Sequence, residues 1–134
     1  MLTQNSVVGV DGGGTKTDAV IIDSQQRVIG EGLAGPSNPL RVGIAAAAAA
    51  IREAIDSACA SAKLRRGDLV AAQIGLAGAR RRELRERMRE TLTPLGIGEI
   101  EVVTDADIAL YGATDGAPGL VVIAGTGSIC CGIN

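Results

Sequence analysis

The sequence contains no histidine, tryptophan or phenylalanine, and Tyr111 is its single aromatic residue. The absence of histidine excludes Ser-His-Asp catalysis, Cys-His catalysis and histidine metal ligands from this chain. A general base would therefore have to be a carboxylate, a lysine or the tyrosine. The scarcity of aromatic residues leaves Val, Ile, Leu and Ala to form the core, and these side chains suit close packing of helices on a sheet.

Cysteine and long apolar runs are also scarce. The three cysteines, Cys59, Cys130 and Cys131, form neither an even set nor a CxxC motif, so the sequence indicates no disulfide framework and no cysteine-based metal or cluster site. No apolar run approaches the roughly 20 residues of a membrane-spanning helix, and residues 1–6 do not resemble a signal peptide. The net charge of −2 argues against a nucleic-acid or anionic-membrane surface. We therefore expect a cytoplasmic protein that binds neither.

Glycine, by contrast, is abundant. The 134 residues include 19 glycines, about twice the usual share of roughly 7%. With 46% hydrophobic and 21% charged residues, the composition is that of a globular protein. The excess of glycine indicates that some segments of the chain need a backbone without side chains.

Apolar runs and turn signals predict a mixed α/β sheet. The expected strands are 6–11, 17–23, 27–33, 68–77, 100–103, 119–124 and 129–134, and the expected helices are 40–63, 80–95 and 105–114. The first three strands should form an antiparallel meander, and the following α-β-α-β-α order should add parallel strands through right-handed crossovers. This predicts a five-stranded sheet with helices on both faces in residues 1–118, and a hairpin in 119–134 that opens a second lobe.

The first chemical motif joins two expected strands. Three glycines let backbone N–H groups point into one concavity that binds phosphate, and a threonine hydroxyl and a lysine charge can add to it. Asp11 ends the preceding strand and could hold Mg²⁺ directly or through water. The motif is neither a Walker A loop nor GxGxxG, and a ligand-free hairpin turn is the alternative. Its residues are Asp11, Gly12, Gly13, Gly14, Thr15, Lys16 and Thr17.

A second glycine-rich turn also follows an apolar run. Gly125, Thr126, Gly127 and Ser128 resemble a second phosphate clamp, although Gly-Thr-Gly is also a common hairpin turn. Two such loops support each other, because a nucleoside triphosphate held between two lobes needs two clamps.

Asp105 lies where an expected strand ends and a helix begins. Without histidine, a carboxylate is the natural acceptor of a substrate hydroxyl proton. The alternative role is a helix N-cap, and both roles are compatible if Thr104 supplies the cap. Asp107 is a competitor that should point to a different helix face.

Two further polar stretches, residues 37–38 and 80–90, give weaker indications of a binding site. Ser37 and Asn38 could bind sugar hydroxyls, but from the residues alone plain loop chemistry before a helix is the favoured explanation. Residues 80–90 carry six arginines and three glutamates, a pattern typical of a solvated helix face with i,i+3 and i,i+4 pairs. A nucleic-acid patch is the less favoured alternative.

Together these motifs resemble the actin-like superfamily of sugar kinases, actins and heat-shock chaperones, and within it the N-acetylglucosamine kinase family, which overlaps the BadF/BadG/BcrA/BcrD-type ATPases. The resemblance is carried by residues 10–17, 37–38, 104–106 and 123–134. It implies a ribonuclease H-like fold and a kinase that uses ATP and Mg²⁺. The small-molecule substrate would be an amino sugar, either N-acetylglucosamine or glucosamine.

The resemblance also implies roles for single residues. Thr15 with its glycines, and Thr126, would hold the ATP phosphates, and Asp11 would help to place Mg²⁺. Asn38, Ser128 and Ile129 would touch the sugar, and Asp105 would accept the proton of its 6-hydroxyl.

The main departure from the family is length. Family members continue into a second lobe with the adenine pocket, whereas this chain stops at Asn134, so we expect it to be inactive alone. Two rival functions stay open: an activator ATPase that drives electron transfer into a dehydratase or reductase, and a non-catalytic sugar sensor. The sequence leaves open whether the protein forms a homodimer.

Overall fold

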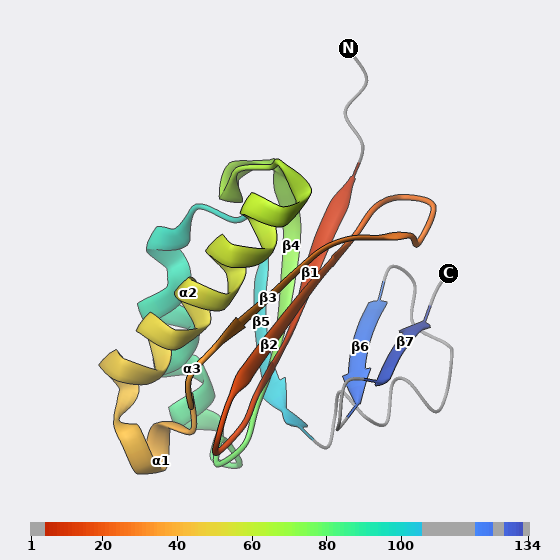
Figure 1. The fold of residues 1–134 in the computed structure, drawn as a ribbon. Helices are drawn as coiled ribbons and strands as arrows, with labels where there is room; N and C mark the ends of the chain where they lie inside the picture. The colour runs from red at the N-terminus through yellow and green to blue at the C-terminus, as the bar shows by residue number, and fades with distance from the viewer. Residues whose placement is uncertain (1–4, 106–119, 125–127, 133–134) are drawn as a thin grey trace.

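The computed structural model describes residues 5–105 with their side chains, and residues 120–124 and 128–132 as backbone. Figure 1 shows a sheet with three helices on one side and a short hairpin on the other. The strands are β1 (Ser6–Gly12), β2 (Thr17–Ile22), β3 (Val28–Ala34), β4 (Leu69–Leu76), β5 (Ile100–Thr104), β6 (Leu120–Ala124) and β7 (Ser128–Gly132). The helices are α1 (Pro39–Val42), α2 (Ile44–Ala62) and α3 (Arg82–Leu92), with short 3₁₀ turns η1 (Arg66–Asp68) and η2 (Thr93–Leu95).

The main sheet has five strands in the order β3-β2-β1-β4-β5. Strands β1, β2 and β3 pair antiparallel, whereas β1, β4 and β5 run parallel. The predicted meander followed by parallel crossovers is therefore confirmed. Because β1, β4 and β5 are parallel, their carboxyl ends lie at one edge of the sheet, the lower edge in Figure 1.

Helix α2 lies unusually close to strand β3. A Cβ atom on Gly32 would collide with the carbonyl of Ala54, and one on Gly30 would collide with the carbonyl of Ala58. Both alanines are fully buried, as are Ile51 and Ile55 of the same helix. Glycine in the strand and alanine in the helix thus allow the two backbones to pack closely, so this part of the core needs no large aromatic side chains.

The expected single helix over residues 40–63 is wrong at its start. The structure breaks it into α1 and α2 at Gly43, whose φ of 90° and ψ of 160° end one helix and begin the next. Asn38 caps α1, and Pro39 occupies its first position, where a missing N–H is no loss. Gly43 thus separates the capped first turn at Asn38 and Pro39 from the long helix α2.

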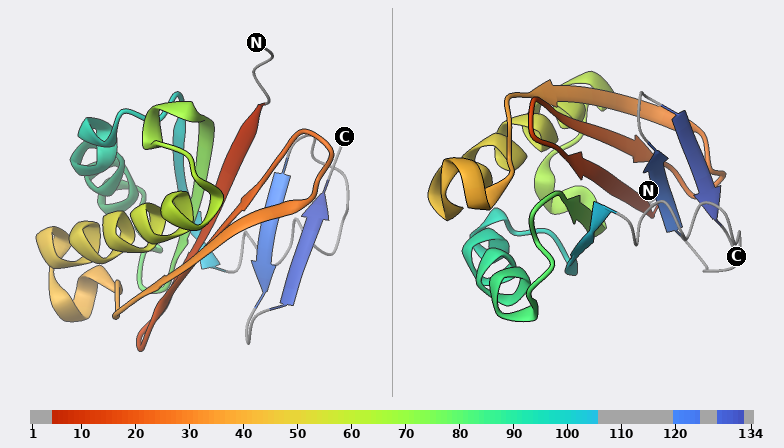
Figure 2. Two further views of the ribbon diagram at one scale, coloured as in Figure 1. Left: turned by 45° about the horizontal axis from the view of Figure 1, so that its top comes forward. Right: turned by 90° about the horizontal axis from the view of Figure 1, so that it is seen from below.

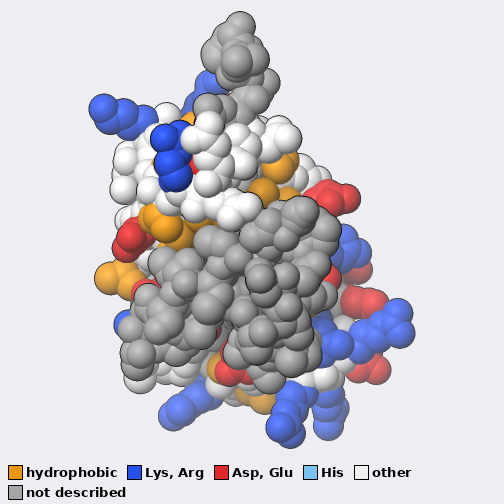
Figure 3. All heavy atoms as spheres, turned by 90° about the vertical axis from the view of Figure 1, so that its right-hand side faces the viewer, with side chains coloured by type: hydrophobic (Ala, Val, Ile, Leu, Met, Phe, Trp, Pro, Cys, Tyr) orange, Lys and Arg blue, Asp and Glu red, His pale blue; other side chains and the backbone are white. Residues whose placement is uncertain are grey.

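Helix α3 is amphipathic as predicted. Met88 and Leu92 are buried, together with Leu95 of η2. The arginines of this helix are exposed except Arg85, which is half-buried. Figure 3 looks onto the opposite side of the molecule, where basic and acidic side chains are both visible around the margin. The prediction of a solvated, charged helix face is confirmed.

The hairpin β6–β7 forms a two-stranded sheet of its own. It lies on the side of the main sheet opposite α2 and α3, with β6 beside β1 and β2 (Figure 2). Both described long helices therefore cover the same face. The helix expected over 105–114 lies outside the described residues apart from Asp105. Among the described helices, none is long and apolar enough to span a membrane.

Candidate functional site

Three loops meet at the lower edge of the sheet. They are the turn between β1 and β2, the segment 35–38 after β3, and residues 77–78 after β4. The N–H of Ala77 donates to the carbonyl of Gly12 (2.9 Å), and the N–H of Ser37 donates to the carbonyl of Gly13 (3.0 Å). Two backbone hydrogen bonds therefore fasten both neighbouring loops to the glycine-rich turn.

The glycine-rich turn presents bare backbone to solvent. Its own closing hydrogen bond runs from the Gly13 N–H to the Lys16 carbonyl (2.9 Å). Gly14, Thr15 and Lys16 are exposed. Within the described part of the chain, the N–H groups of Gly14 and Thr15 donate to no partner. Free backbone N–H donors in a turn are the feature of an anion-binding nest, and the charge of Lys16 can add to it.

A buried hydroxyl pair supports this turn from below. Thr17 and Ser37 are both 0% exposed, and their hydroxyl oxygens lie 2.7 Å apart. The Thr17 hydroxyl also lies 2.7 Å from the Gly35 carbonyl, which can only accept. Thr17 must therefore donate to Gly35, and Ser37 must donate to Thr17. Both residues were predicted to bind ligands, but the structure directs their hydroxyls into the protein.

Asn38 is half-exposed, and its side chain caps helix α1. Its Oδ1 accepts from the N–H of Leu40 (2.9 Å). The amide lies against Gly78, where a Cβ atom would be 2.8 Å from the Asn38 Cγ. Of the two adjacent residues predicted to bind sugar, Asn38 is thus the one with a polar group near the surface.

Acidic side chains gather around Asp11 at the end of β1. Asp11 pairs with Asp18 across β1 and β2. Burial raises the pKa of Asp11, and the negative charges of Asp18 and Asp105 raise it further, whereas the Lys16 charge lowers it. Lys16 lies 3.7 Å from Asp18. Among the described residues, no three such side chains converge as the ligands of a preformed metal site.

The second glycine-rich turn cannot be compared in the same way. Gly125, Thr126 and Gly127 lie outside the described residues. Ser128 and Ile129 open strand β7, and only their backbone is described. Predicted contacts of these residues with phosphate or sugar stay predictions.

Sequence reasoning overlooked Asp18 and Gly78. The short turn between β1 and β2 pairs Gly12 with Thr17, which places Asp11 opposite Asp18. That register could have been counted from the turn length. Gly78 follows a strand parallel to β1, so its place at the same edge was also accessible from the predicted topology.

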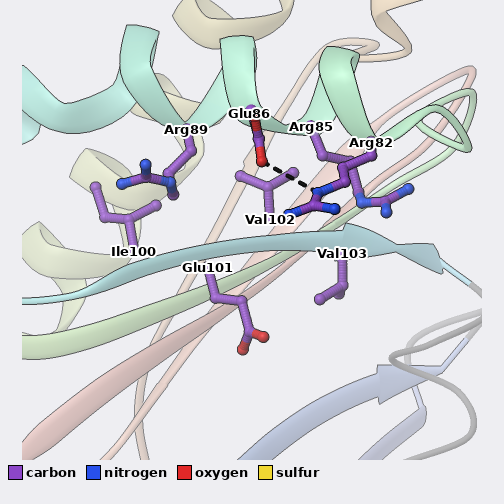
Figure 4. Close-up of a pocket in the computed structure, with 8 residues that line it drawn as sticks. All are labelled: Arg82, Arg85, Glu86, Arg89, Ile100, Glu101, Val102 and Val103. Atoms are coloured by element: carbon purple, nitrogen blue, oxygen red, sulfur yellow. Dashed lines mark hydrogen bonds and ion pairs between the residues drawn. The ribbon is translucent and has the colours of Figure 1, made fainter.

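A separate groove lies between α3 and the edge strand β5. Figure 4 shows the side chains of α3 projecting over the strand, and the volume is about 340 Å³. Arg82 pairs with Glu86 (3.2 Å), and Arg85 donates to the carbonyls of Ala79 and Arg80 (2.9 and 2.7 Å). Its lining residues are Arg82, Arg85, Glu86, Arg89, Ile100, Glu101, Val102 and Val103. None of these is a predicted site residue. Arg82 and Arg85, two of the groove's three arginines, already bond to groups of the protein.

Comparison with known proteins gives concordant results. The N-acetylmuramic acid/N-acetylglucosamine kinase of Clostridium acetobutylicum is 37% identical over 129 residues, which cover 96% of this chain and 42% of that protein. The glucosamine kinase GspK of Vibrio cholerae is 36% identical over 131 residues, or 96% of this chain and 43% of that protein. The chain thus spans less than half the length of these curated relatives.

A solved structure from Chromobacterium violaceum, described as that of a candidate N-acetylglucosamine kinase, superposes with a TM-score of 0.72 at 26% identity, covering 96% of this chain and 48% of that one. This likeness confirms the predicted actin-like, ribonuclease H-like fold. Residues 8–134 match the BadF/BadG/BcrA/BcrD ATPase family. The chain therefore belongs to the BadF/BadG/BcrA/BcrD ATPase family.

Proposed function

We propose that the chain is the phosphate-binding lobe of an ATP-dependent amino-sugar kinase. The observation that carries the proposal is the set of groups at one sheet edge: the N–H donors of the glycine-rich turn that are free within the described residues, a lysine, Asp11 under the like charges of Asp18 and Asp105, and the Asn38 amide. Free donors and a lysine suit phosphate, carboxylates suit a cation and a proton acceptor, and an amide suits a sugar. The names of the two curated relatives support an amino sugar as substrate.

ATP and Mg²⁺ fit these residues. The turn from Gly12 to Lys16 would hold phosphate oxygens through its N–H groups and the Thr15 hydroxyl, and residues 125–127 would form the second clamp. Mg²⁺ commonly takes only one or two carboxylates and completes its shell with water and phosphate oxygens, so the lack of a three-ligand cluster among the described residues is compatible with it. Asp11, whose pKa is raised by burial and by like charges, is the carboxylate that a cation would relieve. When bound, Mg²⁺ neutralises charge that develops on the phosphates.

The proposed reaction transfers the γ-phosphoryl group of ATP to the 6-hydroxyl of the sugar. A bond forms between the sugar oxygen and the γ-phosphorus as the bond from that phosphorus to the β–γ bridging oxygen breaks, and ADP leaves. Asp105 accepts the hydroxyl proton. Asp105 is exposed and acts electrostatically on Asp11, so the expected base and the expected cation ligand are neighbours. Asn38, with Ser128 and Ile129, would orient the sugar.

We further propose that residues 1–118 form the first lobe and that residues 119–134 open a second lobe. The second lobe would supply the adenine pocket and close over the substrates to exclude water. On this proposal the chain alone turns over no substrate, so activity is measured on the full-length protein.

The test is coupled ADP release by the full-length protein with N-acetylglucosamine, with glucosamine and without sugar. The Asp105→Asn variant should lower sugar-dependent turnover by about 10²–10⁴-fold, the range for loss of a general base. Asp107→Asn is the matched control and should retain turnover. Sugar-independent ATP hydrolysis would overturn the kinase proposal in favour of an activator ATPase, and a lack of any turnover would favour a sensor.

A further inference from the structure

Ser37 and Asn38 are neighbours in the chain but face opposite environments. Ser37 is fully buried, and both its hydroxyl and its N–H are bonded within the protein. Asn38 is half-exposed at the start of α1. The two residues therefore have different roles. Ser37 holds the segment against the protein, whereas Asn38 can bind a ligand.

The orientation of the Asn38 amide is fixed by its partner. The oxygen and nitrogen of an asparagine side chain are ordinarily interchangeable, and hydrogen bonds decide between them. The partner here is the backbone N–H of Leu40, which can only donate, so the atom facing it must be Oδ1 (2.9 Å). The free atom is then Nδ2, whose N–H donors have no acceptor among the described residues. The free atom of the Asn38 amide can therefore offer a ligand only donors, while Oδ1 is already bonded to the Leu40 N–H and is the Asn38 atom nearest to the Cβ position of Gly78.

Gly78 leaves the space in which this amide lies. A Cβ atom there would collide with Oδ1, and it would be 2.8 Å from Cγ and 3.1 Å from Nδ2. The φ of Gly78 is +80°, a conformation that residues with a side chain rarely adopt. The preceding residue, Ala77, is fastened to the Gly12 carbonyl (2.9 Å), so Gly78 cannot easily withdraw. Gly78 therefore sets the place of the Asn38 amide relative to the glycine-rich turn.

We propose that Gly78 is a positioning residue for sugar recognition, which holds the Asn38 amide so that only N–H donors face the substrate. The sugar atom opposite the Asn38 Nδ2 is then an acceptor, either a hydroxyl oxygen or an acetyl carbonyl oxygen, and not an ammonium group. The inference rests on the proposed amino-sugar kinase function. It adds a specificity-determining residue that touches neither ATP nor sugar.

The first test compares two glycines with the same backbone conformation. Gly78→Ala introduces both strain at positive φ and a collision with Asn38. Gly96→Ala introduces only the strain, because Gly96 has a φ of +79° and nothing within 4 Å of a Cβ. In the full-length protein, Gly78→Ala should raise the KM for sugar about tenfold, as expected for one misplaced hydrogen bond, and leave the KM for ATP unchanged. Gly96→Ala should change neither KM.

The second test removes the donors and keeps the cap. Asn38→Asp retains an oxygen for the Leu40 N–H, so helix α1 stays capped. The variant offers the sugar acceptors in place of donors. Calorimetric titration with N-acetylglucosamine in the absence of ATP should show affinity reduced by about tenfold or more, because two acceptors then face each other.

The outcomes separate the inference from the function on which it rests. If the parent protein shows sugar-dependent turnover but Gly78→Ala raises both KM values equally, or Asn38→Asp binds sugar normally, Gly78 does not position a sugar ligand. If the parent shows no sugar-dependent turnover, the proposed function is wrong, and the inference about Gly78 is wrong as well. A selective rise in the sugar KM together with weakened sugar binding supports both.

Discussion

The two turns of the β1–β2–β3 meander lie at opposite ends of the same strands, and their carboxylates have different surroundings. In the turn between β2 and β3, the buried carboxylate of Asp23 accepts from the N–H groups of Gln25 and Arg27 (2.9 and 3.0 Å) and from Nε of Arg27 (2.9 Å). These bonds, led by the Arg27 N–H, hold the pKa of Asp23 below its usual value. At the other end, burial and like charges raise the pKa of Asp11.

This difference in carboxylate environment indicates that the β2–β3 turn is structural and that the β1–β2 turn is suited to bind a charged ligand. The first satisfies its carboxylate within five residues of sequence, 23–27. Among the described residues, the second leaves the N–H donors of Gly14 and Thr15 free. It also sets Asp11 opposite Asp18, and the charge of Lys16 offsets this repulsion only in part, because the pKa of Asp11 stays raised. Local destabilisation of this kind is common where a protein binds charged ligands.

The largest expected effect concerns Gly12, which ends β1 at the candidate site. A Cβ atom there would collide with the Ser37 hydroxyl and with the Leu76 side chain. Gly12→Ala should lower the free energy of unfolding by about 3 kcal/mol, the upper part of the usual range for overpacking. The matched control is Gly14→Ala, where nothing lies within 4 Å and the change should stay within about 0.5 kcal/mol. Urea unfolding measures both, and equal losses would contradict the role given to Gly12.

Thr17 tests the support beneath the turn. Thr17→Val keeps the shape but leaves the Gly35 carbonyl and the Ser37 hydroxyl without their buried partner, which should cost about 2 kcal/mol. Thr17→Ser should restore most of the loss, because the hydroxyl returns. Thr15→Val, at an exposed position of the same turn, is the control for stability and should change it by less than about 0.5 kcal/mol. A Thr17→Val variant as stable as the parent would show that the hydroxyl pair contributes nothing.

The strand pattern was accessible from the sequence because apolar runs and glycine-rich turns are local signals. All five strands of the main sheet and the amphipathic helix α3 follow from them. The break at Gly43 was not predicted, because the alanine run after it is so favourable for helix that it obscured a glycine at positive φ. Pro39 and Asn38 together were the missed signal of a separate helix start.

The candidate site was predictable in its location but not in its orientations. The glycine-rich turn and Asp105 were identified because each follows an apolar strand. Ser37 was considered alongside Asn38, since both are polar loop residues, and only the hydrogen bond to Thr17 shows that Ser37 points inward. Such directions depend on contacts between segments about 20 residues apart, which no local pattern encodes.

The smallest expected effect is the pH dependence of the β2–β3 turn. Because the pKa of Asp23 is lowered on folding from an ordinary value of 3.8, its contribution is present above that value and is lost as the pH falls through the lower folded pKa. The free energy of unfolding should therefore decline below about pH 4, and Asp23→Asn should make that decline shallower. Parallel curves for parent and variant would show that Asp23 is not a source of the acid sensitivity.

The contrast between the two turns is tested most directly by unfolding the full-length Asp11→Asn and Asp23→Asn proteins at neutral pH with and without Mg-ATP. The raised pKa of Asp11 means that ionisation opposes folding, so Asp11→Asn should be more stable than the parent without ligand, whereas Asp23→Asn should be less stable. Mg-ATP at about 100 times its Kd should stabilise the parent by about 2.7 kcal/mol and Asp11→Asn by much less, which reverses their order. An Asp11→Asn protein that is less stable than the parent without ligand, or equally stabilised by Mg-ATP, would contradict the account.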